Sequence, residues 1–291
     1  MATIYTNIDS NIKRTWILFT VFLIIIIGIG WFLSYYFDSF FILIIAIVFS
    51  VFMSFLSYWQ SDKIVLAISS AKEVKQENNR ELYYLVENLC ITAGLPVPRI
   101  YLIDDSALNA FATGRNPQKA VIVFTTGLLE KLDRSELEGV IAHELSHIGN
   151  RDILLQTVVV VLVGFITLIA DIFIRMSIRG KRSSKGGQAQ GIIMIIGLVF
   201  LILSPIIAKL MQFAISRKRE YLADASGSLL TRYPEGLARA LEKISKESAL
   251  KKPNKATAHL FIANPFKKVS KFFSTHPPVE ERIKRLRKIN I

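Results

Sequence analysis

The chain has 291 residues, of which 52% are hydrophobic, and a formal net charge of +13. Its mean hydropathy of +0.40 argues against a purely soluble protein. The positive charges cluster beside the apolar runs, without a basic helix or an aromatic RNA-binding motif, which favours anionic lipid over nucleic acid as the charged partner. A single cysteine, Cys90, excludes an intramolecular disulfide and gives no sign of an oxidising compartment.

Four apolar runs account for the high hydropathy, and they cover residues 16–37, 40–60, 153–174 and 191–208. Each run is near the roughly 20 residues that a helix needs to cross a hydrocarbon core. Buried helices of a soluble core are the alternative, but these runs are too long and have no polar face. The first run is also too long for a cleavable signal peptide, and a second follows almost at once. The sequence therefore predicts four transmembrane helices in two hairpins.

Between the second and third runs, helix and strand signals alternate. Residues 63–95 have apolar residues three and four positions apart, which predicts a helix that Pro96 and Pro98 end. Short strands are expected at 99–103, 109–114 and 120–124. The third and fourth runs enclose a Gly/Ser/Lys-rich loop, and later helices are expected around 220–224, 234–246 and 279–289.

The most informative stretch is residues 141–147, which contain an H-E-x-x-H pattern. On a helix, His143 and His147 share one face, so both imidazoles can bind one metal ion. Zinc suits such ligands and leaves room for a water in catalytic sites. Glu144 can reach that water and act as its base. The alternative is a chance pattern on a surface helix with no metal.

Three features favour the metal site over a chance pattern. The chain has only four histidines, and two of them lie in this motif. The local sequence predicts a helix, with a capping box at residues 135–138 and a C-terminal end at Gly149. An apolar stripe would also bury one side of this helix, and it consists of Leu137, Ile141, Leu145 and Ile148.

A catalytic zinc site normally has a third protein ligand. Beyond the fourth run, Glu220 and Asp224 lie four residues apart, so one helix face can offer one carboxylate to the metal and another to a ligating imidazole. The alternative is a solvated, charged helix face, because such pairs are common.

The predicted topology places these two regions together. With four spans, residues 63–151 and 213–291 share one side of the membrane. The basic residues on that side make it cytoplasmic by the positive-inside tendency, and they are Lys13, Arg14, Lys63, Lys72, Lys75, Arg217, Lys218 and Arg219. The basic loop 175–190 disagrees, because the same topology places it outside. Either the charges beside the first hairpin determine the orientation of the protein, or the last two runs do not fully cross the membrane.

The motifs taken together resemble the HtpX family of membrane-bound zinc metallopeptidases, which are gluzincins. The resemblance rests on the segments 109–117, 126–129, 139–147, 216–224 and 274–278, and it covers nearly the whole chain. It implies an α+β fold, mostly helical, with four transmembrane helices and a zincin-like domain that carries a small sheet. The related CAAX prenyl proteases have a larger transmembrane bundle, which this chain does not match.

The resemblance also implies roles for individual residues. His143, His147 and Glu220 would bind one Zn²⁺, Glu144 would be the general base and proton shuttle, and Asp224 would support His143. His276 would stabilise the oxyanion, and its alternative is an exposed loop histidine. An extended peptide would pair with an edge strand formed by Asn109, Ala110, Phe111 and Ala112, for which a buried structural strand is the alternative. His259 is expected to be packed rather than a fourth ligand.

These inferences predict a zinc endopeptidase in the plasma membrane with a cytoplasmic active site. Its domains would be a first hairpin (1–62), two parts of a peptidase domain (63–151 and 213–291) and a second hairpin (152–212). Its substrates would be peptides and proteins, in particular misfolded or damaged membrane proteins. The alternatives are a CAAX-type prenyl-protein protease and a zinc-containing membrane scaffold without turnover. Glu144 argues against the scaffold because it would lie at the site without being a ligand, whereas structural zinc sites usually have four protein ligands.

Overall fold

A computed structural model describes residues 4–164, 166, 217–251, 253–254, 257–266 and 277–290. The fourth apolar run and the loop 175–190 lie outside the described residues, and the third run is described only in its first half. Within the described part the chain is mostly helical and has one small sheet. This agrees with the expected α+β class.

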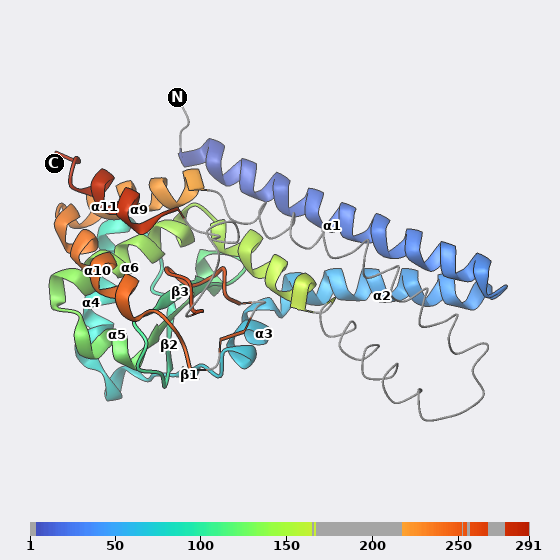
Figure 1. The fold of residues 1–291 in the computed structure, drawn as a ribbon, viewed down its shortest axis with the longest axis horizontal. Coiled ribbons are helices and arrows are strands. Elements are labelled where there is room, and N and C mark those ends of the chain that lie inside the picture. Colours follow the sequence, from blue (N-terminus) through green and yellow to red (C-terminus); the bar gives the residue numbers. More distant parts are fainter. Residues whose placement is uncertain are drawn as a thin grey trace.

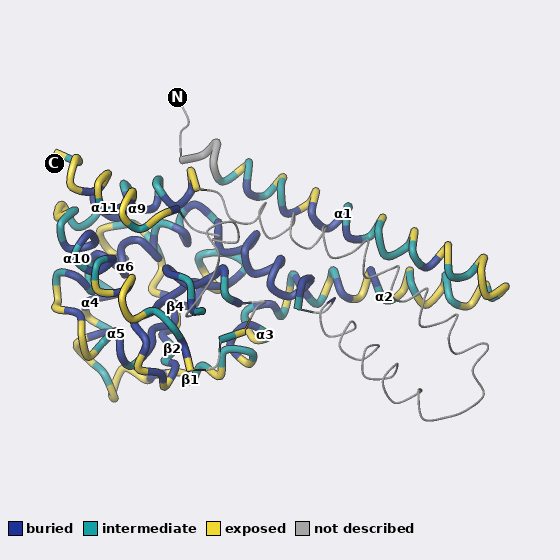
Figure 2. Tube along the Cα trace, viewed as in Figure 1, coloured by how far each residue is buried: buried dark blue, intermediate teal, exposed yellow. Residues whose placement is uncertain are grey.

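Two long helices, α1 (Ile4–Tyr36) and α2 (Phe40–Trp59), extend side by side away from the part of the molecule that holds the sheet (Figure 1). Asp38, at φ 49°, makes the tight turn between them. Much of their outer surface is exposed (Figure 2), and this surface is apolar, as Trp31, Phe40 and Phe55 illustrate. Among the described residues, only these two helices are individually long and apolar enough to cross a membrane. The chain is therefore a membrane protein.

The third apolar run begins as a helix over Asp152–Gly164, which is bent by 83° from the helix before it. Arg151 makes the bend in a left-handed conformation at φ 56°. The new helix packs against the hairpin, because Leu155 and Val158 belong to the same buried cluster as Phe22 of α1. Counting the bent pair as one span gives up to three spans in the described residues, so the described part does not establish the predicted total of four.

The structure corrects the continuous helix predicted for residues 63–95. The chain instead forms α3 (Ser61–Ile68), the short strand β1 (Lys72–Glu73), a 3-10 turn (Gln76–Asn78) and α4 (Arg80–Ala93). Ser70 takes a left-handed φ of 53°, which ends the first helix. Cys90, on α4, is fully buried in the core.

The sheet has the order β1-β2-β4-β3. Its main strands are β2 (Arg99–Ile103), β3 (Ala110–Thr113) and β4 (Val121–Thr125), so the three predicted strands are confirmed to within one residue. A 3-10 turn (Pro117–Lys119) joins the last two. β2 pairs with β4 in parallel, and the β1–β2 and β3–β4 pairs are antiparallel. β3 is therefore an edge strand.

Five further helices complete the described fold: α5 (Thr126–Lys131), α6 (Arg134–Gly149), α9 (Arg217–Thr231), α10 (Pro234–Glu247) and α11 (Val279–Leu286). α6 contacts β3 on one side and α9 and α10 on the other (Figure 1). The close approach of α10 requires Gly139 of α6, since a Cβ there would lie 2.7 Å from the backbone nitrogen of Leu237. α6 is thus a central helix of the fold, with most of its second half buried.

A candidate metal centre

The H-E-x-x-H motif lies on α6 as predicted, although the helix begins differently. The capping box is formed by Asp133 and Glu136, not by residues 135–138. Glu136 is buried and also pairs with Lys243 of α10 at 2.6 Å, so it ties the start of α6 to a neighbouring helix. The Asp133 oxygen accepts the backbone N–H of Glu136, a cap that contributes roughly 1 kcal/mol.

His143 and His147 face each other on one side of α6, with their Nε2 atoms 3.2 Å apart. Glu220 of α9 completes a group of three. Its Oε1 lies 3.6 Å from His147 Nε2, and its Oε2 lies 3.8 Å from His143 Nε2. All three side chains are buried. One donor atom from each lies within 4.8 Å of the others, and no second such group occurs in the described residues.

This donor set fits a small divalent cation. Ligands bound tetrahedrally to zinc at about 2.0–2.1 Å lie about 3.3 Å from one another, which is close to the three separations in the structure. Imidazole nitrogen together with carboxylate oxygen is also a donor set that zinc accepts. The candidate metal centre is hereafter the group of His143, His147 and Glu220.

Close packing of α9 on α6 brings Glu220 to the histidines. The buried face of α9 has residues at spacings of three and four: Glu220, Ala223, Asp224, Gly227 and Ser228. A Cβ on Gly227 would lie 3.0 Å from the backbone nitrogen of His143. The absence of a side chain at this position therefore lets the two helix backbones approach closely.

Asp224 contacts His143 on the side of the ring that faces away from the metal position. Its Oδ1 lies 3.1 Å from His143 Nδ1, the ring nitrogen on that side. Arg282 of α11 donates to both oxygens of Asp224, at 2.9 and 2.7 Å, and is fully buried. Its Nη1 also donates to the backbone oxygen of Ile262. Arg282 could not be predicted, because nothing in the local sequence distinguishes it from the other basic residues of this helix.

Asp152 supports His147 in the corresponding way. Its Oδ2 lies 3.0 Å from His147 Nδ1, and its side chain is almost fully buried. Asp152 was not predicted either. One signal could have revealed it, because Asp152 is a carboxylate five residues after His147 and directly before a long apolar run.

Glu144 lies beside the metal centre and is 2% exposed. Burial, together with the negative charge of Glu220, raises the pKa of Glu144 to about 7. Its carboxylate accepts a hydrogen bond from the backbone N–H of Ala112 on β3. A buried carboxyl group that titrates near neutrality is suited to accepting and returning a proton.

The histidines have different proton affinities in the metal-free protein. Burial lowers the pKa of His143, and the positive charge of Arg282 acts in the same direction. Burial alone would also lower the pKa of His147, but its hydrogen bond to Asp152 and the charge of Glu220 raise it to about 9. At neutral pH the metal-free centre therefore holds a proton on His147.

Comparison with known proteins identifies the family. The family model for peptidase family M48 matches residues 76–290. A protease HtpX homolog from Thermoanaerobacter pseudethanolicus is 44% identical over 99% of both chains. One from Dictyoglomus turgidum is 48% identical over 98% of this chain and 94% of that protein. A third, from Pyrococcus furiosus, is 48% identical over 85% of this chain and 86% of that protein.

The chain belongs to peptidase family M48. It is a metalloprotease, and the predicted relationship to HtpX is confirmed. Among solved structures, the S. mikatae Ste24p crystal structure is 20% identical to this M48 chain, over 94% of this chain and 67% of that one, with a TM-score of 0.49.

The predicted substrate-binding strand of this M48 chain corresponds to β3 and the residue before it. All four residues, Asn109 to Ala112, are buried. The Ala110 oxygen accepts the backbone N–H of Ile262, and the Asn109 amide donates to the Ala263 oxygen. The outer edge of β3 is therefore already paired at Ala110, whereas at Ala112 it faces Glu144.

Of the other two histidines, only His259 is described, and it is not part of the metal centre. His259 is fully buried, and its Nε2 lies 3.3 Å from the backbone oxygen of Gln156. This agrees with the expectation that it is packed. His276, the predicted oxyanion donor, lies outside the described residues.

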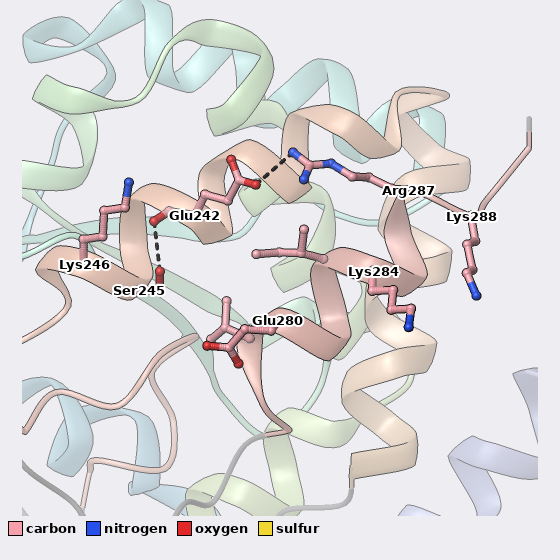
Figure 3. A pocket seen from close by; sticks show the side chains of 9 residues that line it. Glu242, Ser245, Lys246, Glu280, Lys284, Arg287 and Lys288 are labelled. Carbon is pink, nitrogen blue, oxygen red and sulfur yellow. Dashed lines mark hydrogen bonds and ion pairs between the residues drawn. The ribbon is translucent and has the colours of Figure 1, made fainter.

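A separate pocket lies between α10 and α11 (Figure 3), and none of the metal-centre residues line it. Its wall carries charges of both signs, among them Glu242, Lys246 and Lys284. Glu242 already pairs with Arg287 across the pocket at 2.9 Å. This pocket lies apart from the metal centre and is not the candidate active site.

Proposed function

We propose that this M48 chain is a zinc-dependent endopeptidase, in which His143, His147 and Glu220 hold one Zn²⁺. The observation that supports this most strongly is the convergence of three buried donors from two distant parts of the sequence beside Glu144. Three protein ligands leave a coordination position for water, as in catalytic rather than structural zinc sites.

When bound, zinc would supply Lewis-acid activation of water and of the scissile carbonyl group. Glu144 then takes a proton from the attacking water and returns it to the departing amine. Its pKa of about 7 makes both transfers accessible at neutral pH. The Ala112 N–H that contacts Glu144 holds this carboxylate at the edge of β3. His276 is proposed as the donor to the oxyanion.

The proposed substrate is an extended peptide that binds along Asn109, Ala110, Phe111 and Ala112 and adds to the outer edge of β3 where that edge is not already paired. Two observations support this position. β3 is the edge strand of the sheet, and Ala112 contacts the proposed base. The backbone at Ala110 is paired with Ile262, so the peptide would bind mainly from Ala112 onward.

We further propose a multi-pass protein of the plasma membrane whose active site faces the cytoplasm and acts on misfolded or damaged membrane proteins. The basic residues beside the first hairpin support this orientation. The role in protein quality control is proposed from the resemblance to the HtpX family, whose members are proteases among the matched relatives. The metal centre also lies close to the membrane helices, since Asp152, which contacts His147, directly precedes the third apolar run. The peptidase domain is proposed to combine residues 63–151 and 213–291 between the hairpins 1–62 and 152–212.

The test uses the full-length protein in detergent and measures zinc content and cleavage of an unstructured peptide. Glu144→Gln should keep about one zinc per chain and lose roughly 10²–10⁴-fold in cleavage rate, the usual contribution of a general base. Glu220→Ala should lose both zinc and activity. Glu138→Gln, a partly exposed position on the same helix, is the matched control and should behave as wild type.

Two results would contradict the proposal. Unchanged zinc content in Glu220→Ala would remove the third ligand, and wild-type cleavage by Glu144→Gln would remove the base. A chelator should stop cleavage by the wild-type protein, and added zinc should restore it. If a prenylated C-terminal peptide were cut far faster than an unprenylated one, the CAAX-type alternative would replace general endopeptidase activity.

A further inference from the structure

A buried polar cluster connects the first membrane helix to the metal centre. Asn11 of α1 is 3% exposed, and its Nδ2 donates to Asp152 Oδ1 at 2.7 Å and to the Asn150 oxygen at 3.0 Å. The other oxygen of Asp152, Oδ2, lies 3.0 Å from His147 Nδ1. One side chain of a membrane helix is therefore two contacts away from a proposed metal ligand.

The orientation of the Asn11 amide is fixed by its neighbours. Its Nδ2 faces two oxygens, and its Oδ1 accepts a hydrogen bond from Arg219 Nη1 at 3.1 Å. Turning the amide over would place an oxygen against two oxygens and a donor against a guanidinium, which can only donate. Asn11 can therefore satisfy all its contacts in one orientation only, and that orientation directs a donor at Asp152.

Arg219 extends the same cluster to α9. Its Nε lies 3.6 Å from Asp152 Oδ1, and its next neighbour in sequence is the metal-centre residue Glu220. The cluster thus joins α1, α9 and the first residue of the helix Asp152–Gly164. These three elements meet where the chain leaves α6 and turns toward the membrane.

We propose that Asn11 is a positioning residue for the metal centre, which acts through Asp152 on the ring orientation of His147. This inference rests on the proposed zinc site. A carboxylate that holds the outer nitrogen of a ligating imidazole fixes its tautomer and direction, and changes in such partners weaken metal binding. Asn11 in turn fixes the carboxylate. The first membrane helix therefore supports the metal centre in addition to anchoring the chain.

A purely structural role for Asn11 makes a different prediction. If Asn11 only helped α1 to pack, its loss would lower stability without changing metal affinity or the environment of the bound metal. The geometry argues for the positioning role, because the shortest contact of Asn11 is to the same carboxylate that contacts His147. Metal binding, measured apart from catalysis, distinguishes the two.

The experiment uses metal-free, full-length protein in detergent and measures zinc affinity by competition with a chromophoric chelator. Asp152→Asn should weaken zinc binding about 10- to 100-fold. Asn11→Ala removes one neutral donor and should weaken it about 2- to 12-fold. Because Asn11 acts through Asp152, the double variant should bind no more weakly than Asp152→Asn alone. Asp9→Ala, an exposed position on the same helix, is the control and should match wild type.

A second readout covers the case in which Asp152→Asn fails to fold. Co²⁺ bound in place of zinc has visible absorption bands that depend on ligand geometry. Asn11→Ala should change these bands, and Asp9→Ala should not. Wild-type affinity and wild-type bands in Asn11→Ala would overturn this inference and leave the proposed zinc site intact. Additive losses in the double variant would also overturn it, whereas failure of the wild-type protein to bind zinc would overturn both proposals.

Discussion

The two histidines of the metal centre are four residues apart on one helix, yet they are held from opposite ends of the chain. His143 is supported by Asp224, whose charge is compensated by the fully buried Arg282 near the C-terminus. His147 is supported by Asp152, which receives a neutral amide donor from Asn11 near the N-terminus and lies 3.6 Å from the Arg219 cation. The first support lies inside the part of the molecule that holds the sheet, and the second lies where this part meets the membrane helices.

This difference shows what each support contributes. Arg282 is a fully buried positive charge that pairs with Asp224, so it contributes to the stability of the fold as well as to the orientation of Asp224. Asn11 is neutral, so its main contribution is to orient the Asp152 carboxylate. The centre therefore combines one support with a bidentate buried cation and another that includes a side chain of a membrane helix.

Removing the buried counter-charge should have the largest effect on stability. Arg282→Gln leaves Asp224 buried beside His143 without its cation, which typically costs about 3–5 kcal/mol. We expect the free energy of unfolding, measured by pulse proteolysis in detergent, to fall by that amount. Arg285→Gln, on the same helix but exposed, is the control. An equal loss in both variants would show that Arg282 is no more important than a surface residue.

Adding a methyl group at Gly227, where α9 packs closely on α6, should have the next largest effect. In an open helix Gly→Ala stabilises by about 1 kcal/mol, but Gly227→Ala would place a Cβ 3.0 Å from the His143 nitrogen. We expect a net destabilisation of about 1–3 kcal/mol, because overpacking forces α9 away from α6, and weaker zinc binding, because Glu220 moves with α9. Ser226→Ala on the same helix is the control. A stabilised Gly227→Ala protein would refute the close packing.

The smallest effect is a pH dependence that arises from His147 and not from His143. The raised pKa of His147, about 9, means that its proton is present at neutral pH and must leave when zinc binds. The lowered pKa of His143 means that it has no proton to lose there. Zinc affinity should therefore increase with pH up to about 9, by at most about tenfold per unit for one released proton.

Calorimetric titration at about pH 8, where Glu144 is mostly ionised and His147 is mostly protonated, measures this proton when it is done in two buffers of different ionisation enthalpy. Release of about one proton per zinc is expected. Asp152→Asn should reduce the release, because the contact that raises the His147 pKa is lost. Binding heats that do not depend on the buffer would show that both imidazoles are neutral before zinc arrives.

Local patterns in the sequence predicted the parts of the molecule that depend on local spacing. His143 and His147 share a face of α6, and Glu220 and Asp224 share a face of α9, because both pairs follow the helical repeat. The strands were also predicted from a local pattern, namely short runs of strand-forming residues bounded by turn residues. The capping box of α6 was misplaced by two residues, because Ser135 and Asp133 are both good caps and the contact with Lys243 selects Glu136 as the partner.

The residues that support the ligands could not be found in this way. Asn11 lies 141 residues from Asp152 in sequence, and Arg282 lies 58 residues from Asp224. Their roles depend on how helices from three regions of the chain come together, which no local period encodes. The split of residues 63–95 has the same origin, since β1 exists only because β2 is available to pair with it.

The buried position of Cys90 has a practical consequence. Burial raises the pKa of this thiol to about 11, so at neutral pH it is protonated and out of reach of alkylating reagents. The unmodified chain is therefore not expected to react with thiol-labelling reagents. A cysteine introduced at exposed Asp9 or Ile91 would be the single reactive site, and its modification from one side of sealed vesicles would report directly which side of the bilayer those residues occupy.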